Sequence, residues 1–195
     1  MFKMSRSALS GAFVASLTAI GLATAPAMSH ASTIEVKSAD PAAGEYCAVI
    51  VSKELDKNGH SKVLAKSCSH ASGEDAHHKA RSEHARASNS PVSAFDETLL
   101  LNEYQDANYG GGVIYSFYGT AGGCDSSGYH LVNYWSVENN VSSMQGYNNC
   151  NRVKVHTEKC DASETNCDWG YFNLDVPYLG DYYNDNVVAL QVYNG

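Results

Sequence analysis

Basic residues are scarce in the C-terminal half of this chain. Residues 96–195 contain thirteen Asp and Glu residues but only three bases, Arg152, Lys154 and Lys159. Eight acids balance eight bases over residues 32–95, so the whole negative charge falls in the C-terminal half. Because binding to nucleic acid requires clustered lysine and arginine, we expect no nucleic-acid partner. A cation or a basic protein surface suits this half better, and the alternative is that the charge only keeps the protein soluble.

The sequence also lacks the short motifs of familiar catalytic and zinc sites. It contains no G-x-S-x-G nucleophile motif and no C-x-x-C pair. Only His130 and His156 fall within residues 98–195, and nothing in the sequence pairs either of them with a nucleophile. A catalytic nucleophile needs a base within hydrogen-bonding reach, so we expect that the protein is not an enzyme.

A single long apolar run is present, and it lies at the N-terminus. Two basic residues precede an apolar stretch over residues 8–22, and small residues surround Ala27 and Ala31. This pattern predicts a secretory signal peptide over residues 1–31, cleaved after Ala27 or after Ala31. No later run approaches the length of a membrane span, so we expect a secreted, extracellular protein that makes no membrane contact.

The cysteines agree with export. Six cysteines in an exported chain indicate disulfides rather than catalytic thiols. Two of them stand alone in the first hundred residues, and another two enclose the short polar loop DASETN. On this reasoning the expected pairs are Cys47 with Cys68, Cys160 with Cys167, and Cys124 with Cys150.

Residues 32–70 predict a short β-hairpin that precedes the main domain. Two apolar runs flank the segment LDKNGH, in which Asn58-Gly59 is a strong hairpin signal. Cys47 and Cys68 stand at the open ends of the two runs. An isolated hairpin is marginally stable, so the expected disulfide would close and stabilise this extension.

Residues 71–97 change character and predict a polar linker. Aromatic residues are absent until Phe95, and alanine, serine, histidine and mixed charge dominate. We expect at most a turn or two of marginal helix here. A transition-metal site is one interpretation of the histidines, but no apolar residues support it, so we expect solvated side chains. The histidines concerned are His77, His78 and His84, together with His70 just before this region.

Residues 98–195 are typical of an all-β domain. Twelve of the thirteen tyrosines lie here, within short segments that alternate polar and apolar residues and end at glycine, asparagine or aspartate. Residues 98–148 can also be laid over residues 152–194 as a weak internal repeat. Each half reads as strand, turn, strand, long tyrosine-rich connection, Asn/Asp turn and final strand. Two such units predict a sandwich of two Greek-key motifs.

Particular residues in this region resemble a known signature. Tyr104, Tyr109 and Gly111 fit the pattern aromatic-x4-aromatic-x-Gly, and the Asn-rich turn WSVENNVSSM follows. Together they resemble the βγ-crystallin superfamily over residues 98–195, most closely secreted bacterial members with a disulfide-bearing N-terminal extension. The resemblance implies an aromatic corner on a tight hairpin, a glycine in a backbone conformation that other residues resist, and a structural serine at Ser143.

The same resemblance implies calcium binding. In this family each Asn/Asp turn supplies a side-chain oxygen, a backbone carbonyl and a Ser/Thr hydroxyl to a cation that prefers six to eight oxygens. In the first turn the implied ligands are Asn139 through its side chain, Asn140 through its carbonyl and Ser142 through its hydroxyl. In the second turn they are Asp185 through its side chain and Asn186 through its carbonyl, following Asn184.

Both turns depart from the family pattern. Glu138 begins the first turn where the family has Asn or Asp, and Val188 and Ala189 occupy the two Ser/Thr positions of the second. Because valine has no side-chain oxygen, the second site is expected to be incomplete. We therefore expect one weak Ca²⁺ site, formed by the first turn or by Asp185 with an incomplete shell. The alternative is that both are ordinary β-turns.

A proteinase inhibitor is the alternative function. The second motif carries the loop CDASETNC where its aromatic corner should fall. A rigid exposed loop suits recognition, although a simple structural staple is the other interpretation. The resemblance includes a secreted metalloproteinase inhibitor, so a secreted proteinase is a second possible partner, bound by this loop or by the loop near Cys124. The acidic charge argues against a third function, an antimicrobial or killer toxin. We expect a monomer.

Overall fold

A computed structural model describes residues 44–91, 96–133, 140–157 and 169–195, all within one compact unit that runs from Lys37 to Gly195. The predicted signal peptide and the expected pair Cys160 with Cys167 lie outside the described residues. Within the described part of the chain, no helix combines the length and the apolar character that a membrane span requires.

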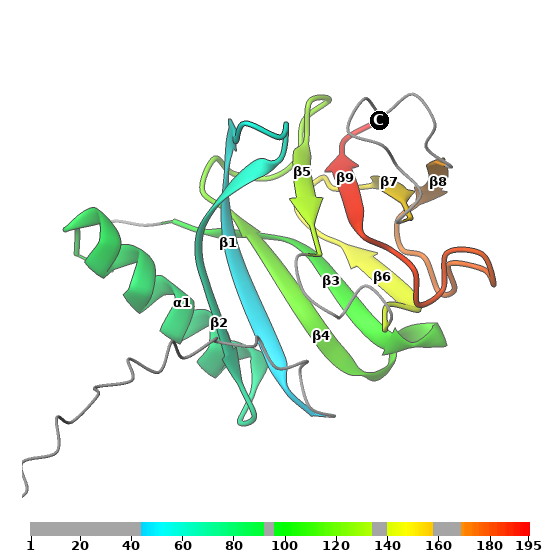
Figure 1. The fold of residues 1–195 in the computed structure, drawn as a ribbon, viewed down its shortest axis with the longest axis horizontal. Coiled ribbons are helices and arrows are strands. Elements are labelled where there is room, and N and C mark those ends of the chain that lie inside the picture. The colour runs from blue at the N-terminus through cyan, green and yellow to red at the C-terminus, as the bar shows by residue number, and fades with distance from the viewer. Residues whose placement is uncertain (1–43, 92–95, 134–139, 158–168) are drawn as a thin grey trace, which may run out of the picture. The chain divides into compact units, whose positions relative to one another are not determined.

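Two β-sheets organise the described residues (Figure 1). The five-stranded sheet has the order β2-β1-β4-β3-β6 and the four-stranded sheet the order β5-β9-β7-β8. The first sheet comprises β1 (Tyr46–Leu55), β2 (Ser61–Ser69), β3 (Thr98–Asp106), β4 (Gly110–Gly119) and β6 (Ser143–Gly146). The second comprises β5 (Tyr129–Val132), β7 (Arg152–His156), β8 (Trp169–Asn173) and β9 (Ala189–Tyr193).

The two sheets exchange strands as two Greek-key motifs do. β3, β4 and β6 of the first motif lie in the five-stranded sheet, whereas β5, which falls between β4 and β6 in sequence, pairs with β9 in the other sheet. The second motif makes the same exchange in the opposite direction. β7, β8 and β9 lie in the four-stranded sheet, and Val176, between β8 and β9, pairs with Met144 of β6. The predicted all-β fold of two Greek-key motifs is confirmed.

The main core lies between the two sheets because alternate residues of each strand point inward. Leu101 and Phe117 contribute from the five-stranded sheet, and Leu131, Val155 and Leu190 from the four-stranded sheet. All five are at most 3% exposed. Burial of this apolar surface, at about 25 cal/mol per Å², is the main force that holds the sheets face to face.

The N-terminal hairpin is part of the first sheet rather than a separate extension. β1 and β2 pair antiparallel with Cys47 opposite Cys68, and β1 pairs in parallel with β4 from Cys47 beside Tyr115 to Val51 beside Gly119. The disulfide between Cys47 and Cys68 is present, as expected. The disulfide between Cys124 and Cys150 is also confirmed.

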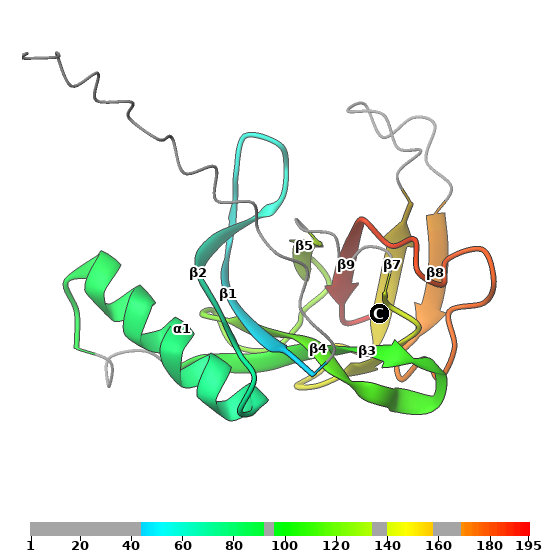
Figure 2. The same ribbon diagram turned by 60° about the horizontal axis from the view of Figure 1, so that its bottom comes forward.

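The segment expected to be a linker contains a helix of four turns, α1 (Gly73–Ser88), which lies along the β1–β2 hairpin (Figure 2). Ser72 caps its N-terminus by accepting a hydrogen bond from the Asp75 backbone N–H. Ala76 and Ala80 are fully buried against a second cluster that includes Ile50. The prediction failed because the buried face consists of alanines, which give little hydrophobic periodicity but pack closely once a sheet is present.

The expectation of solvated histidines is correct for His70 and His78, which are exposed, and wrong for the other two. His77 stacks on Tyr118 with ring centroids 3.7 Å apart, and burial lowers its pKa to about 4. His84 is 8% exposed and lies 3.9 Å from Glu97. These two side chains are packing residues of the interface between helix and sheet.

Candidate functional site at the two turns

The hairpin that joins β3 and β4 forms one side of the candidate site. It contains the short 3-10 turn η2 (Ala107–Tyr109), and the rings of Tyr104 and Tyr109 meet edge to face with centroids 5.6 Å apart. Gly111 has a φ of +67°, and a Cβ there would lie 2.7 Å from Asp106 Oδ2. The structure thus places an aromatic corner and a required glycine where the signature puts them.

Two buried serines tie the first turn to this hairpin. Ser143 Oγ donates to the Asp106 carbonyl at 2.6 Å and accepts from the Tyr109 N–H at 3.0 Å. Ser142 Oγ donates to the Gln105 carbonyl at 2.6 Å. Ser143 therefore ties the first turn to the hairpin through two hydrogen bonds, and Ser142 keeps its hydroxyl lone pairs for another partner.

Replacing Ser143 by alanine should lower the free energy of unfolding by about 2 kcal/mol. The change removes two partly buried hydrogen bonds, at about 1 kcal/mol each, and leaves the Tyr109 N–H and the Asp106 carbonyl without this partner. Urea unfolding measures the loss. Ser142→Ala is the matched control and should lower the free energy of unfolding less, because the Ser142 hydroxyl makes a single hydrogen bond, to the Gln105 carbonyl. Equal losses in the two variants would contradict the double role of Ser143.

The second turn lies against the first. The Asp185 N–H donates to the Val141 carbonyl at 3.1 Å, and the Asn186 N–H closes its own turn on the Tyr183 carbonyl at 3.2 Å. Asp185 has a φ of +55°, a conformation that Asp and Asn tolerate better than other residues with side chains. The two Asn/Asp turns, more than forty residues apart in sequence, are therefore neighbours in the fold.

Acidic and amide side chains lie at the second turn and on the hairpin. Asp185 Oδ2 accepts from Asn184 Nδ2 at 2.7 Å, and Asn184 Oδ1 is buried and makes no hydrogen bond within the described residues. Burial raises the pKa of Asp185, and the charge of Asp106 raises it further. These two carboxylates are thus close enough to influence each other. Asp106 was missed from the sequence because its proximity to Asp185 depends on the packing of the two motifs.

The remaining residues of the two turns lie outside the described residues, are described in part, or supply no side-chain oxygen. Asn139 and Glu138 lie outside the described residues, whereas Asn140 begins the described part of the first turn. Val188 donates its N–H to the His156 carbonyl and supplies no side-chain oxygen. Its presence therefore leaves the shell of the second turn short of the hydroxyl that the family places there.

The described residues contain one group of three acidic, imidazole or thiol side chains, and it is not suited to a metal ion. In the described ranges, one group of three such side chains has ligand atoms within 4.8 Å of one another: Glu45, Cys47 and Cys68. Both of its sulfurs belong to a disulfide and are not available as thiolates. Any cation at the turns would accordingly rely on amide, carbonyl and water oxygens besides the two carboxylates.

Two solved structures are similar to this fold, and both are βγ-crystallin domains. One is a nickel complex of a clostrillin double mutant, with 15% identity, a TM-score of 0.34, and coverage of 50% of this chain and 100% of that chain. The other is a domain from Clostridium beijerinckii, with 15% identity, a TM-score of 0.32, and coverage of 48% of this chain and 97% of that chain. No protein-family model and no curated protein matches the sequence. The likeness concerns the fold alone.

Proposed function

We propose that this chain is a secreted, non-enzymatic βγ-crystallin-like protein that binds one calcium ion weakly, between the first-motif hairpin and the second turn. The observation that supports the site is the repulsion between two carboxylates. The charge of Asp106 is one of the causes that raise the pKa of Asp185. A divalent cation bound between them would replace this repulsion by attraction, which is a direct source of binding free energy.

The available ligand atoms are oxygens, which calcium prefers, but they are fewer than calcium requires. Calcium prefers six to eight hard oxygens. The described residues offer the carboxylates of Asp106 and Asp185 and the buried Oδ1 of Asn184, whose lack of a hydrogen bond leaves it suited to a cation. Water would complete the shell because Val188 replaces a hydroxyl ligand. A partly hydrated site of this kind suits an affinity in the range of about 10⁻⁴ to 10⁻³ M, which is typical of extracellular calcium modules.

Calcium should raise the melting temperature of the mature chain. A ligand that binds only the folded state at about ten times its dissociation constant stabilises by about 1.4 kcal/mol, which corresponds to a few degrees for a domain of this size. Asp185→Asn should abolish most of this rise. Asp96→Asn is the matched control, because it removes one exposed acid at the opposite end of β3 and should leave the rise intact.

Two outcomes would contradict this site. The first is a melting curve that calcium leaves unchanged. The second is an Asp185→Asn variant that responds to calcium as the parent does. If Ser142→Ala alone abolished the response, the ion would instead occupy the first turn, with Asn139 and Asn140.

Export is a separate part of the proposal and has its own test. Protein recovered from the culture medium should begin after Ala27 or after Ala31, as measured by intact-mass spectrometry. Full-length protein retained in the cell would contradict the predicted signal peptide.

Proteinase inhibition is the alternative function, and no described contact favours it over calcium binding. It would use the loop between Cys160 and Cys167, which lies outside the described residues, or the loop near Cys124. A panel of metallo-, serine and cysteine proteinases tests it. Slowing of any of them by micromolar protein would support inhibition, and uniform lack of effect would remove it.

A further inference from the structure

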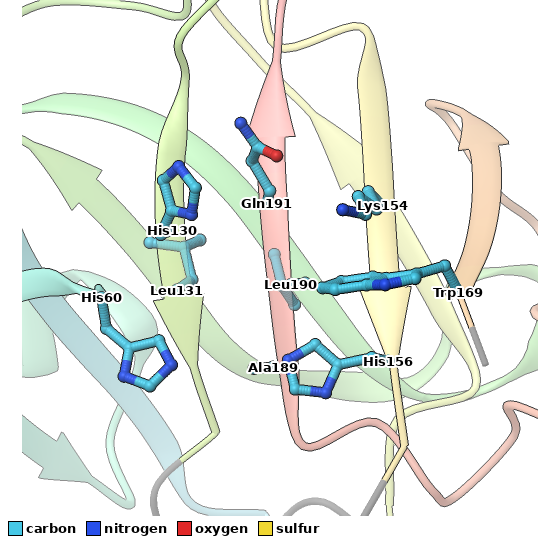
Figure 3. A pocket seen from close by; sticks show the side chains of 9 residues that line it. All are labelled: His60, His130, Leu131, Lys154, His156, Trp169, Ala189, Leu190 and Gln191. Carbon is cyan, nitrogen blue, oxygen red and sulfur yellow. The ribbon is translucent and has the colours of Figure 1, made fainter. Parts of the chain in front are cut away.

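A shallow pocket of about 30 Å³, roughly the space of one oxyanion group, lies on the outer face of the four-stranded sheet and shares no residue with the two Asn/Asp turns (Figure 3). Ala189 contributes an apolar side chain, whereas the side chains of Leu131 and Leu190, which also line it, belong to the core on the other face of the sheet. Its polar side chains all carry N–H groups, and no carboxylate of the described residues lines it. These polar side chains are His60, His130, Lys154, His156, Trp169 and Gln191.

Lys154 supplies the fixed positive charge of this pocket. Its Nζ lies 3.5 Å from the centroid of the Trp169 ring and 6.0 Å from that of Tyr171. Attraction between an ammonium group and an aromatic face holds the cation in place. His156 meets the same indole edge to face at 4.7 Å. One of the three bases in an otherwise acidic half of the chain is thus held at a pocket whose described lining contains no acid.

The N-terminal hairpin contributes one side chain, His60, to the lining of the pocket. His60 belongs to the connection between β1 and β2, where Asp56 Oδ1 accepts hydrogen bonds from the N–H groups of His60 and Asn58. The His130 N–H donates to Ser61 Oγ at 3.0 Å, which joins the start of β2 to β5. The hairpin is therefore anchored beside the four-stranded sheet with His60 at the pocket.

Gln191 of β9 adds a neutral donor between β5 and β7. In the pairing of the sheet it lies opposite His130 on one side and Lys154 on the other. One hydrogen of its amide is used by the Ser127 carbonyl at 3.0 Å, and the amide has a second. Three adjacent strands therefore each present a nitrogen donor on the same face of the sheet.

We propose that this pocket binds a small organic anion, with its oxyanion group held by Lys154 and the surrounding imidazoles and its apolar part against Ala189 and Trp169. Charge complementarity is the basis, because a site whose described lining offers donors and no carboxylate favours an acceptor that carries negative charge. Chelation of a metal ion by the histidines fits less well. Nowhere in the described residues do His60, His130 and His156 form a group with ligand atoms within 4.8 Å.

The test titrates phenyl phosphate, benzoate and neutral benzyl alcohol into the full mature chain, with EDTA present and at about pH 6, where imidazoles carry partial charge. Backbone amide shifts of β5, β7 and β9 report binding. The anions should bind and the alcohol should not, and the stronger of the two anions distinguishes phosphate from carboxylate ligands. Lys154→Met should weaken anion binding about tenfold or more. Lys62→Met, an equal change of charge at an exposed residue of β2, should leave it unchanged.

A second variant keeps the test valid if Lys154→Met fails to fold. His60→Asn lies on another element and should weaken binding several-fold. The proposal is overturned if neither anion shifts these amides at about 10 mM, or if benzyl alcohol binds as well as benzoate. Equal loss in the Lys62→Met control would also overturn it. Because EDTA removes calcium, failure here is independent of the calcium site.

Discussion

Replacing Glu103 by glutamine should stabilise the protein by about 3 kcal/mol at pH 7 and by almost nothing at pH 4. Glu103 of β3 is fully buried between the two sheets, opposite Tyr115 of β4 and Met144 of β6. Burial raises the pKa of its carboxyl from about 4.5 to about 8, and a hydrogen bond from Asn133 lowers it only in part. A neutral side chain of the same shape avoids this penalty.

The direction in which stability changes with pH follows from the number of protons that Glu103 binds in the folded and unfolded states. Between about pH 4.5 and pH 8 the folded state keeps the proton of Glu103 while the unfolded state has lost it. Stability from this group is therefore fully present below pH 4.5 and is lost progressively as the pH rises to about 8. Glutamine does not titrate, so its advantage over glutamate should grow through this window and level off above it.

The local hydrogen bonds are compatible with the substitution. Asn133 Nδ2 donates to Glu103 Oε1 at 3.3 Å and to the Val187 carbonyl at 3.2 Å. Glu103 Oε2 and Asn133 Oδ1 are both buried without a hydrogen bond in the described residues. A glutamine amide can accept from Asn133 Nδ2 and donate to Asn133 Oδ1 as a protonated carboxyl can, so the two neutral side chains should be nearly equivalent at pH 4.

Chemical unfolding of parent and variant at several pH values measures this effect. His77, whose lowered pKa gives the opposite slope at acid pH, titrates in both proteins and cancels in the difference. Glu54→Gln, the same chemical change at an exposed residue of β1, is the control and should show no such growth. A constant difference between parent and Glu103→Gln across pH would show that the folded-state carboxyl is not protonated.

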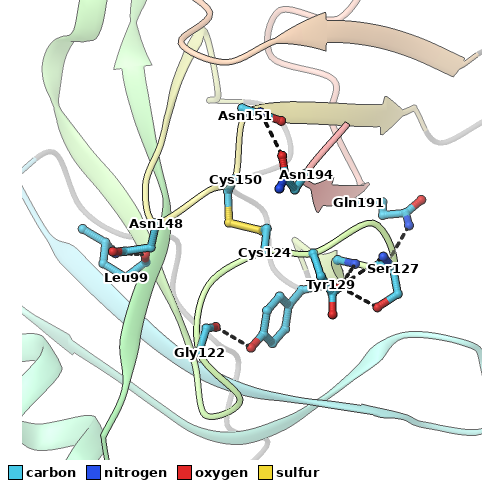
Figure 4. The surroundings of a disulfide bond; sticks show 12 residues. Leu99, Gly122, Cys124, Ser127, Tyr129, Asn148, Cys150, Asn151, Gln191 and Asn194 are labelled. Atoms are coloured by element: carbon cyan, nitrogen blue, oxygen red, sulfur yellow. Dashed lines mark hydrogen bonds between the residues drawn. A yellow bond between two sulfur atoms is a disulfide. The ribbon is translucent and has the colours of Figure 1, made fainter.

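Removing the disulfide between Cys124 and Cys150 should lower the free energy of unfolding by about 3 kcal/mol. The bond closes a segment with a sequence separation of 26 residues, and in the chain-entropy model a loop of this size contributes about 3 kcal/mol. It also joins the loop before β5 to the loop before β7, where the Cys124 N–H donates to the Asn148 carbonyl at 3.0 Å (Figure 4). The change is Cys124→Ala with Cys150→Ala.

The disulfide between Cys47 and Cys68 is the natural comparison, because its sequence separation of 21 residues is similar. Since β1 is paired with β4, the hairpin should unfold together with the rest of the described unit. Removing either bond should therefore shift a single transition by a similar amount, as measured by guanidinium unfolding followed by circular dichroism. A separate early transition after loss of Cys47–Cys68 would instead mark the hairpin as an independent extension.

Local features were predictable from the sequence because local chemistry determines them. Alternating polarity locates β3, β4, β7 and β9, since side chains of a strand point alternately to its two faces. The hairpin signal Asn58-Gly59 lies in the connection between β1 and β2, and Gly111 lies at a positive φ that glycine adopts readily. Two disulfides were predictable because few alternative pairings matched the spacing of the segments.

Other features were decided only by the tertiary structure, because each depends on which surfaces meet. Helix α1 is stable through alanines whose burial requires the β1–β2 hairpin beneath them. Glu103 occupies an ordinary strand position, and its burial becomes visible only when the second sheet covers it. Asp106 approaches Asp185, and His60 approaches the four-stranded sheet, through pairings between segments far apart in sequence. The sequence by itself thus determined the strands, the turns and the acidic C-terminal half, while long-range packing decided which of the charged and polar residues act together.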